Sequence, residues 1–204
     1  MREAPAMRDP TAYLKPHHIA QMIEAEPVLR NKLIIRLLFR GGMRVSELCG
    51  TEISNIVWYE NCIWIPWLKR KEKGRKRKIP LDSVTMDMIQ DYLDWRKKYH
   101  VYEGNKRLIP LDRRTVYWIV RRAAERVGIT EVGDHNSRYN HPHPHTLRHS
   151  YATWRVAKVG GDYGNLRKIQ LDLGHAHIDT TASYLAVSGE ERHKGYDEAF
   201  EELD

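Results

Sequence analysis

Apolar residues recur at intervals of three and four along most of the chain, in stretches that end at glycines, prolines or polar loops. Such intervals place apolar side chains on one face of a helix, so they predict a mostly helical protein. The first predicted helix begins at Pro16, the second carries Leu33 to Leu38 and stops at Gly41, and a short third helix begins near Val45. The fourth carries Val84 to Leu93 after a cap at Asp82 or Ser83, and the fifth covers about 113–127, with Asp112 before it. Further helices are expected over about 146–158, 165–173 and 189–203.

The pattern changes in the middle of the chain, where β-branched and aromatic residues are concentrated. Residues 56–59 and 62–65 are separated by Glu60 and Asn61, which favours two strands joined by a tight turn. We expect a third strand over 78–81. The fold class is therefore α+β and mainly helical, with a small three-stranded antiparallel sheet.

The 204 residues are enough for one sizeable hydrophobic core. We expect a loose arm or linker remnant over 1–12, one domain over 13–188, and an acidic helix over 189–204. No apolar run approaches the ~20 residues of a membrane helix, no secretory signal opens the chain, and two cysteines make no disulfide framework. These features predict a cytoplasmic protein with free thiols and no membrane partner.

Positive charge is concentrated in one segment. Residues 69–78 hold eight basic residues and one acid, a surplus equal to the net charge of +7 of the whole chain. This surplus favours a polyanion partner, although charge alone is as compatible with a solvated loop or a localisation signal. The segment precedes the third expected strand, so it would form a turn of the sheet.

Four further short motifs carry candidate chemistry, although each alone is weak. They read Gly42-Met43-Arg44-Val45-Ser46-Glu47-Leu48, His145-Thr146-Leu147-Arg148-His149-Ser150-Tyr151-Ala152-Thr153, Leu173-Gly174-His175 and Thr180-Thr181-Ala182-Ser183-Tyr184. In this order, with the basic segment and with nine residues from His175 to Tyr184, they resemble the tyrosine recombinases, or phage-type integrases. The resemblance is greatest to Xer-type and archaeal or viral integrases and covers about residues 14–190. It implies that family's catalytic-domain fold and site-specific recombination of double-stranded DNA.

The resemblance implies a reaction in which Tyr184 attacks a DNA phosphate and remains joined to the 3′ end as a phosphotyrosine. Attack adds negative charge to the phosphate oxygens, and the guanidiniums of Arg44 and Arg148 can clamp those oxygens with charge-assisted hydrogen bonds. Because the arginines supply this charge, we expect no metal, no other cofactor and no ATP.

Protons must also move during this reaction. A phenol with a pKa of about 10 has to lose its proton to attack, and a nearby histidine can take it. The resemblance assigns that role, or an orienting role, to His145, and a hydrogen bond to the phosphate to His175. It makes Glu47 and His149 residues that orient the reacting side chains. Without the family, Glu47 would be read as an exposed helix acid.

A lysine in the basic turn would protonate the leaving 5′ oxygen. The family often has Lys-Gly-x-Lys here, which matches Lys73 to Lys76, so Lys73 is the expected acid and Lys71 the alternative. Other basic residues of the segment are expected to contact phosphates. These are Lys69, Arg70, Lys71, Arg75, Lys76 and Arg77.

The family also implies self-association on DNA, as a tetrameric synapse, in which the segment after Tyr184 docks on a neighbouring protomer. The acidic helix over 189–203 would then be exchanged between protomers, or it would pack on its own domain. Such a protein would be associated with the nucleoid, or act in the host cytoplasm if it is viral.

Three other interpretations compete with this one. A type IB topoisomerase or a telomere resolvase would use the same chemistry, and a non-cleaving DNA-binding protein could keep the fold. Binding alone does not require a tyrosine nine residues after a histidine, and the compact size and the Leu-Gly-His motif favour a recombinase.

A zinc site could be suspected at the histidines, but their spacing fits no common zinc motif. They are His141, His143, His145 and His149.

Overall fold

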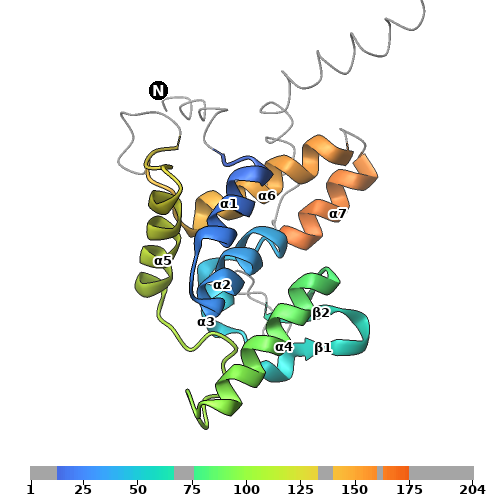
Figure 1. Ribbon diagram of the computed structural model, residues 1–204. Coiled ribbons are helices and arrows are strands. Elements are labelled where there is room, and N and C mark those ends of the chain that lie inside the picture. Colours follow the sequence, from blue (N-terminus) through green and yellow to red (C-terminus); the bar gives the residue numbers. More distant parts are fainter. Residues whose placement is uncertain (1–12, 67–75, 133–139, 160–162, 175–204) are drawn as a thin grey trace, which may run out of the picture.

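The computed structural model describes residues 13–66, 76–132, 140–159 and 163–174, drawn in colour in Figure 1. The helices of this part are α1 (Pro16–Ala25), α2 (Leu29–Arg40), α3 (Val45–Gly50), α4 (Ser83–Lys98), α5 (Arg113–Arg126), α6 (Pro144–Val159) and α7 (Tyr163–Leu173). The strands are β1 (Ile56–Val57), β2 (Cys62–Pro66) and β3 (Lys76–Pro80). This arrangement confirms the predicted fold class. The acidic helix expected over 189–203 lies outside the described residues.

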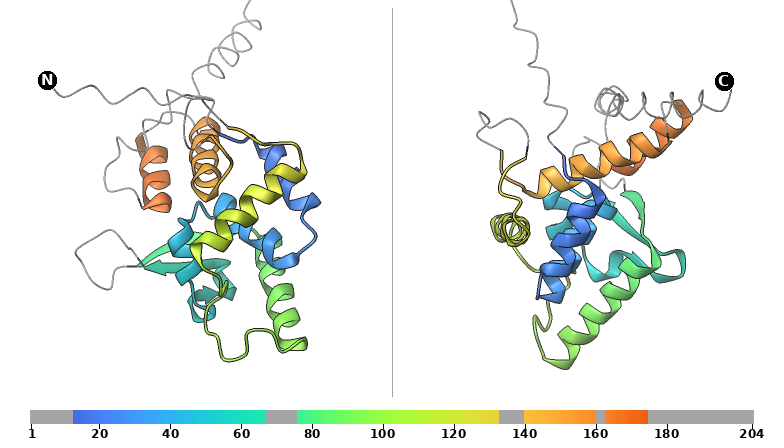
Figure 2. Two further views of the ribbon diagram at one scale, coloured as in Figure 1. Left: turned by 90° about the vertical axis from the view of Figure 1, so that its left-hand side faces the viewer. Right: turned by 45° about the horizontal axis from the view of Figure 1, so that its top comes forward.

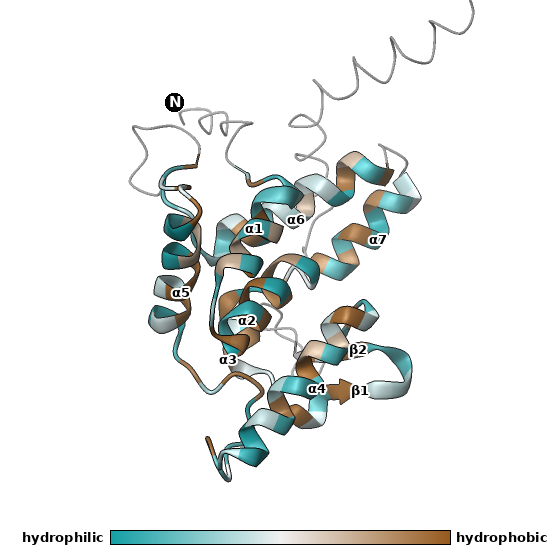
Figure 3. Cartoon of the chain, viewed as in Figure 1, coloured by the Kyte–Doolittle hydropathy of each residue, from teal (hydrophilic) through white to brown (hydrophobic). Residues whose placement is uncertain are grey.

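Helix α2 lies at the centre of the fold and is buried on nearly all sides. Between Leu33 and Leu38, every residue except Arg36 is apolar and inaccessible to solvent. The helix packs against α1, α3, α4, α5 and α6. Hydrophobic residues alternate with hydrophilic ones along the surrounding helices, as one-sided burial requires (Figure 3). Helix α2 ends at Arg40, and the buried residues Gly41 to Met43 connect it to the half-buried Arg44.

The three strands form an antiparallel sheet in the order β1-β2-β3. Strand β1 is shorter than predicted, because residues 58–60 turn into a short 3-10 helix and Asn61 adopts a left-handed conformation with φ +48°. Strand β3 begins earlier than predicted, at Lys76. The last three basic residues of the run, Lys76 to Lys78, therefore belong to a strand with two faces and not to a turn.

Two helix starts follow the predicted capping chemistry. The Asp82 side chain accepts a hydrogen bond from the Thr85 amide at 2.9 Å, and the Asp112 side chain accepts one from the Thr115 amide at 2.7 Å. Such caps satisfy amides that have no partner within the helix. They fix where α4 and α5 begin.

Helices α6 and α7 bring two further motif segments, residues 145–153 and 173–174, to the same region. Helix α6 packs against α2 and α7, and α7 contacts β3. The two further views show α6 and α7 together on one side of the fold (Figure 2). The segment after α2, the start of α6, the end of α7 and strand β3 thus approach one another. Among the described helices, none is long and apolar enough to cross a membrane.

Candidate active site

Arg44 stands at the start of α3, directly after the buried residues Gly42 and Met43. Gly42 has φ +54°, a conformation that glycine adopts without a steric penalty. Arg44 is the extended residue before the first turn of α3. Its guanidinium donates to Glu47 at 2.9 Å and to the Gly174 carbonyl at 3.3 Å, so Arg44 links α3 to the end of α7.

Glu47 is buried and binds two arginines. Its Oε2 accepts the Arg44 backbone amide at 2.7 Å and the Arg77 guanidinium at 2.8 Å, while Oε1 accepts the Arg44 side chain. Its residue exposure is only 2%. A buried carboxylate requires such partners, because an unpaired buried charge is very costly. Glu47 is therefore an internal anchor for guanidiniums and not an exposed helix acid.

Arg148 is buried on the inner face of α6, with an exposure of 4%. Its guanidinium donates to the carbonyls of Gly42 and Leu173, and its Nη1 lies 3.9 Å from Glu47 Oε2. Arg44 and Arg148 thus both lie within 4 Å of Glu47, and both donate to carbonyls of the last two residues before His175. The structure brings together the two arginines expected from the sequence.

Arg77 is placed differently from the expectation that it contacts DNA. It is only 5% exposed and its Nη2 donates to Glu47 Oε2. Burial lowers the pKa of the Arg77 guanidinium, and the neighbouring Glu47 carboxylate opposes that shift. Arg77 pairs with buried Ile65 across the sheet, whereas Lys76 and Lys78 are exposed. Strand alternation turns Arg77 inward, so it does not lie on the surface, where a phosphate contact was expected.

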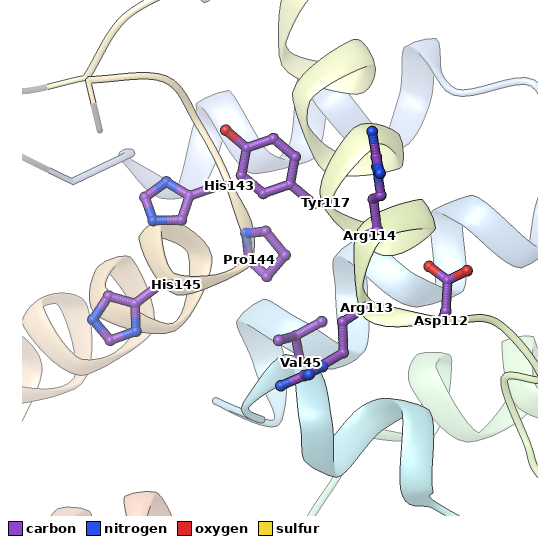
Figure 4. A pocket seen from close by; sticks show the side chains of 8 residues that line it. All are labelled: Val45, Asp112, Arg113, Arg114, Tyr117, His143, Pro144 and His145. Carbon is purple, nitrogen blue, oxygen red and sulfur yellow. The ribbon is translucent and has the colours of Figure 1, made fainter. Parts of the chain in front are cut away.

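His145 lies in the first turn of α6, three residues and about one helical turn before Arg148. It is exposed and borders a pocket of about 610 Å³ shown in Figure 4. The pocket lies between the starts of α3, α5 and α6. Its lining residues are Val45, Asp112, Arg113, Arg114, Tyr117, His143, Pro144 and His145. Arg113 and Arg114 are exposed as well, so the pocket presents cations beside His145.

The neighbouring histidines of the His-rich loop have backbone partners. His141 Nδ1 lies 2.9 Å from the Thr130 carbonyl, and His143 Nδ1 lies 2.8 Å from the His141 carbonyl. His143 also stacks obliquely near His145, with ring centroids 6.3 Å apart. Within the described part of the chain, no three His, Cys, Asp or Glu side chains are grouped so that they could hold a metal ion. His149, expected to orient the site, is half-buried on α6.

Comparison with known proteins agrees with this geometry. Residues 12–191 match the phage integrase family. The chain belongs to that family. A tyrosine recombinase of Thermosipho africanus is 32% identical over 187 residues, which are 88% of this chain and 59% of the relative.

Solved structures of recombinases share the fold of this phage integrase domain. The crystal structure of XerA recombinase matches with a TM-score of 0.74 and 25% identity, over 96% of this chain and 66% of that one. XerH recombinase in a post-cleavage complex with its difH substrate matches with a TM-score of 0.71 and 23% identity, over 96% and 55% of the two chains. The chain spans little more than half the length of the curated relatives that it matches.

Several residues that the family resemblance singles out lie outside the described residues. They are Lys69, Arg70, Lys71, Lys73, Arg75, His175 and Tyr184. Lys76 is described and exposed at the start of β3. The roles of these residues stay predictions.

Sequence reasoning missed two groups beside the arginines of this integrase fold. Asp172 lies 3.4 Å from Arg155, and burial raises the pKa of its carboxyl while Arg155 and Arg77 oppose the shift. Burial also raises the pKa of Tyr151, whose ring packs where a side chain on Gly42 would extend. No local motif marks Asp172, but Tyr151 lies three residues after Arg148, a spacing that places both on one face of α6.

Proposed function

We propose that this chain is the strand-cleaving and strand-joining domain of a site-specific tyrosine recombinase. The observation that carries the proposal is the surplus of positive charge around Glu47. Guanidinium nitrogens of Arg77, Arg44 and Arg148 lie 2.8, 2.9 and 3.9 Å from this one carboxylate. Three positive charges beside one negative charge in a buried setting favour a further anion.

A DNA phosphodiester fits that requirement. It carries one negative charge, and its two non-bridging oxygens can each accept guanidinium hydrogen bonds. When a nucleophile attacks the phosphorus, further negative charge develops on those oxygens. Arg44 and Arg148 are then stabilisers of the transition state, and losing one such donor typically costs about 10²–10³ in rate. Before substrate binds, Arg44 is held by Glu47 and Arg148 by the carbonyls of Gly42 and Leu173, so little reorganisation is needed.

In the proposed step, the Tyr184 phenol oxygen forms a bond to phosphorus and the bond from phosphorus to the 5′ oxygen breaks. The phenol proton passes to His145, and the 5′ oxygen receives a proton from Lys73, with Lys71 as the alternative donor. The strand's 3′ phosphate remains on Tyr184. A 5′ hydroxyl of another strand reverses the step, so the phosphodiester is rebuilt without ATP.

The proposed partner is double-stranded DNA, on which several copies of the chain assemble. The proposed assembly is a synapse of four protomers. The XerH relative is bound to its difH substrate, which supports a DNA partner for this chain. We place the strand next to the cleaved phosphate along the pocket beside His145, where Arg113 and Arg114 can contact phosphates. Exposed Lys76 on β3 offers a further contact.

A nicked suicide substrate tests the proposal. Once the protein cleaves it, a short fragment dissociates, rejoining stops and the covalent complex accumulates. We expect a complex that survives denaturation with the intact chain and none with Tyr184→Phe, which should still bind DNA. Binding without any adduct would instead favour a non-cleaving DNA-binding protein. Relaxation of supercoiled DNA without recombinant product would favour a topoisomerase.

A further inference from the structure

Arg77 is buried in a strand whose neighbouring residues face solvent. Lys76 and Lys78 are exposed on either side of it, and Ile79 shares its inner face. Lys78 forms an ion pair with Glu60 on the outer face. Alternation along β3 therefore separates one arginine from the rest of the basic run. A residue that serves only to attract DNA would gain nothing from this burial.

The hydrogen bonds of Arg77 are incomplete within the described part of the chain. Its Nη2 donates to Glu47 Oε2, but its Nε and Nη1 are buried and have no partner there. A buried guanidinium with unmatched donors is an inefficient source of stability, and apolar residues often replace buried ion pairs without loss. Packing alone thus gives a poor account of why an arginine occupies this position.

Arg77 helps determine which donors each carboxylate oxygen of Glu47 accepts. Oε1 takes the Arg44 side chain, and Oε2 takes the Arg44 amide and Arg77. Arg148 Nη1 lies 3.9 Å from the same Oε2, beyond hydrogen-bond distance. If Arg77 were absent, Oε2 would have spare acceptor capacity facing Arg148. Arg148 would then be drawn toward Glu47 and away from an incoming phosphate.

We propose that Arg77 is a positioning residue for the cleavage reaction. It occupies Glu47 Oε2, fixes the carboxylate that orients Arg44, and prevents Arg148 from turning toward Glu47. This inference rests on the proposed function, since it concerns the same phosphate-binding arginines. It predicts that losing Arg77 impairs the chemical step and spares DNA affinity, because a misplacement of about 1 Å can cost on the order of 10² in rate.

The test compares Arg77→Met with Lys76→Met in the full chain. Methionine has a similar length and no donor, and Lys76 is the exposed neighbour on the same strand. The rate of single-turnover cleavage is measured on the nicked substrate at saturating DNA, and the Kd is measured over a series of salt concentrations. We expect Arg77→Met to cleave about 10–10² times more slowly with an unchanged salt slope. Lys76→Met, which removes a DNA contact of the proposed function, should instead weaken binding and lose up to about one unit of slope.

Two further variants distinguish positioning from a purely structural role. Arg77→Lys can restore one charged donor to Glu47, so it should recover part of the cleavage rate that Arg77→Met loses. In a Glu47→Gln background, Arg77→Met should have little additional effect, because its target carboxylate is gone. Thermal unfolding of each variant is recorded, and cleavage is compared at a temperature where all are folded.

The outcomes separate this inference from the proposed function. An intact chain that forms no adduct overturns both. If the intact chain cleaves and Arg77→Met cleaves equally fast, or if the Arg77 and Glu47 effects simply add, only the positioning role is overturned. A loss of salt slope in Arg77→Met like that in Lys76→Met would restore Arg77 as a direct DNA contact and also overturn it.

Discussion

Gly42→Ala should destabilise the fold and disturb the cleavage site at the same time. A Cβ atom at Gly42 would lie 2.6 Å from Cδ1 and 2.8 Å from Cε1 of Tyr151, and 3.1 Å from Cδ2 of Leu173. Real Cβ atoms essentially never approach other atoms below 3.0 Å. The Tyr151 ring or the Gly42 backbone must therefore move.

The magnitude follows from two contributions. Holding alanine at φ +54° costs about 1–2 kcal/mol, and overpacking a tight site costs about 1–3 kcal/mol. The free energy of unfolding should fall by about 2–5 kcal/mol in total. For a domain of this size, about 2–4 °C per kcal/mol corresponds to a decrease in Tm of roughly 4–20 °C.

The same substitution should also slow cleavage, because it displaces the Gly42 carbonyl. Gly42 accepts a hydrogen bond from the buried Arg148 guanidinium, so a shifted Gly42 moves a group that is proposed to bind the phosphate. Below the lowered Tm, cleavage of the nicked substrate should still be slower by on the order of 10².

Gly50→Ala is the matched control. Gly50 ends α3, and a Cβ there would meet nothing within 4 Å, so stability should be unchanged or rise by up to about 1 kcal/mol. Thermal unfolding and single-turnover cleavage of both variants decide the matter. If Gly42→Ala melts within about 2 °C of the parent and cleaves normally, the packing argument and the link to Arg148 are refuted.

Four further outcomes are expected. Cleavage should persist in EDTA, because arginines supply the charge that a metal supplies elsewhere; loss with chelator and recovery with zinc or magnesium would revive a metal role. Lys73→Ala should slow cleavage with little change in DNA affinity. A substrate with a 5′-bridging sulfur, whose leaving group needs no proton, should restore its cleavage rate. If this substrate rescues Lys71→Ala instead, Lys71 and not Lys73 is the general acid. Truncation after Ser188 should keep DNA affinity and lose cooperative assembly; unchanged cooperativity and cleavage would leave the C-terminal segment a packing role only. Replacing Arg113 and Arg114 by alanine should reduce the salt slope of DNA binding by up to about two units. Arg122→Ala, an exposed control on the same helix, should leave the slope unchanged. Equal effects would contradict the proposal that DNA runs along the pocket.

The helical part of the fold could be predicted because its apolar periodicity and capping residues agree. The spacing within 33–38 indicated the buried helix α2, and Asp82 and Asp112 marked the helix starts that the structure shows. Local sequence and tertiary packing favour the same conformation in these segments. The meeting of Arg44 and Arg148 was predictable only through the order of the family motifs, since 104 residues separate them.

The inward position of Arg77 was the main failure of the sequence interpretation. A dense basic run favours a solvated turn, and that composition concealed the strand that begins at Lys76. Counting back in twos from the apolar Ile79 would have placed Arg77 on the inner face. The first strand failed for the opposite reason: Trp58 and Tyr59 favour a strand by composition, but they begin the short helix that leads into the turn at Asn61.

The most direct measurement is the identity of the residue that carries the DNA after cleavage. The covalent complex is trapped on the nicked substrate, treated with nuclease and trypsin, and sequenced by mass spectrometry. Trypsin releases the peptide Ile169–Arg192, in which Tyr184 is the only tyrosine. We predict a nucleotide 3′-phosphate on this tyrosine and on no other residue. A nucleotide on a different peptide, or a 5′-phosphate linkage, would contradict it.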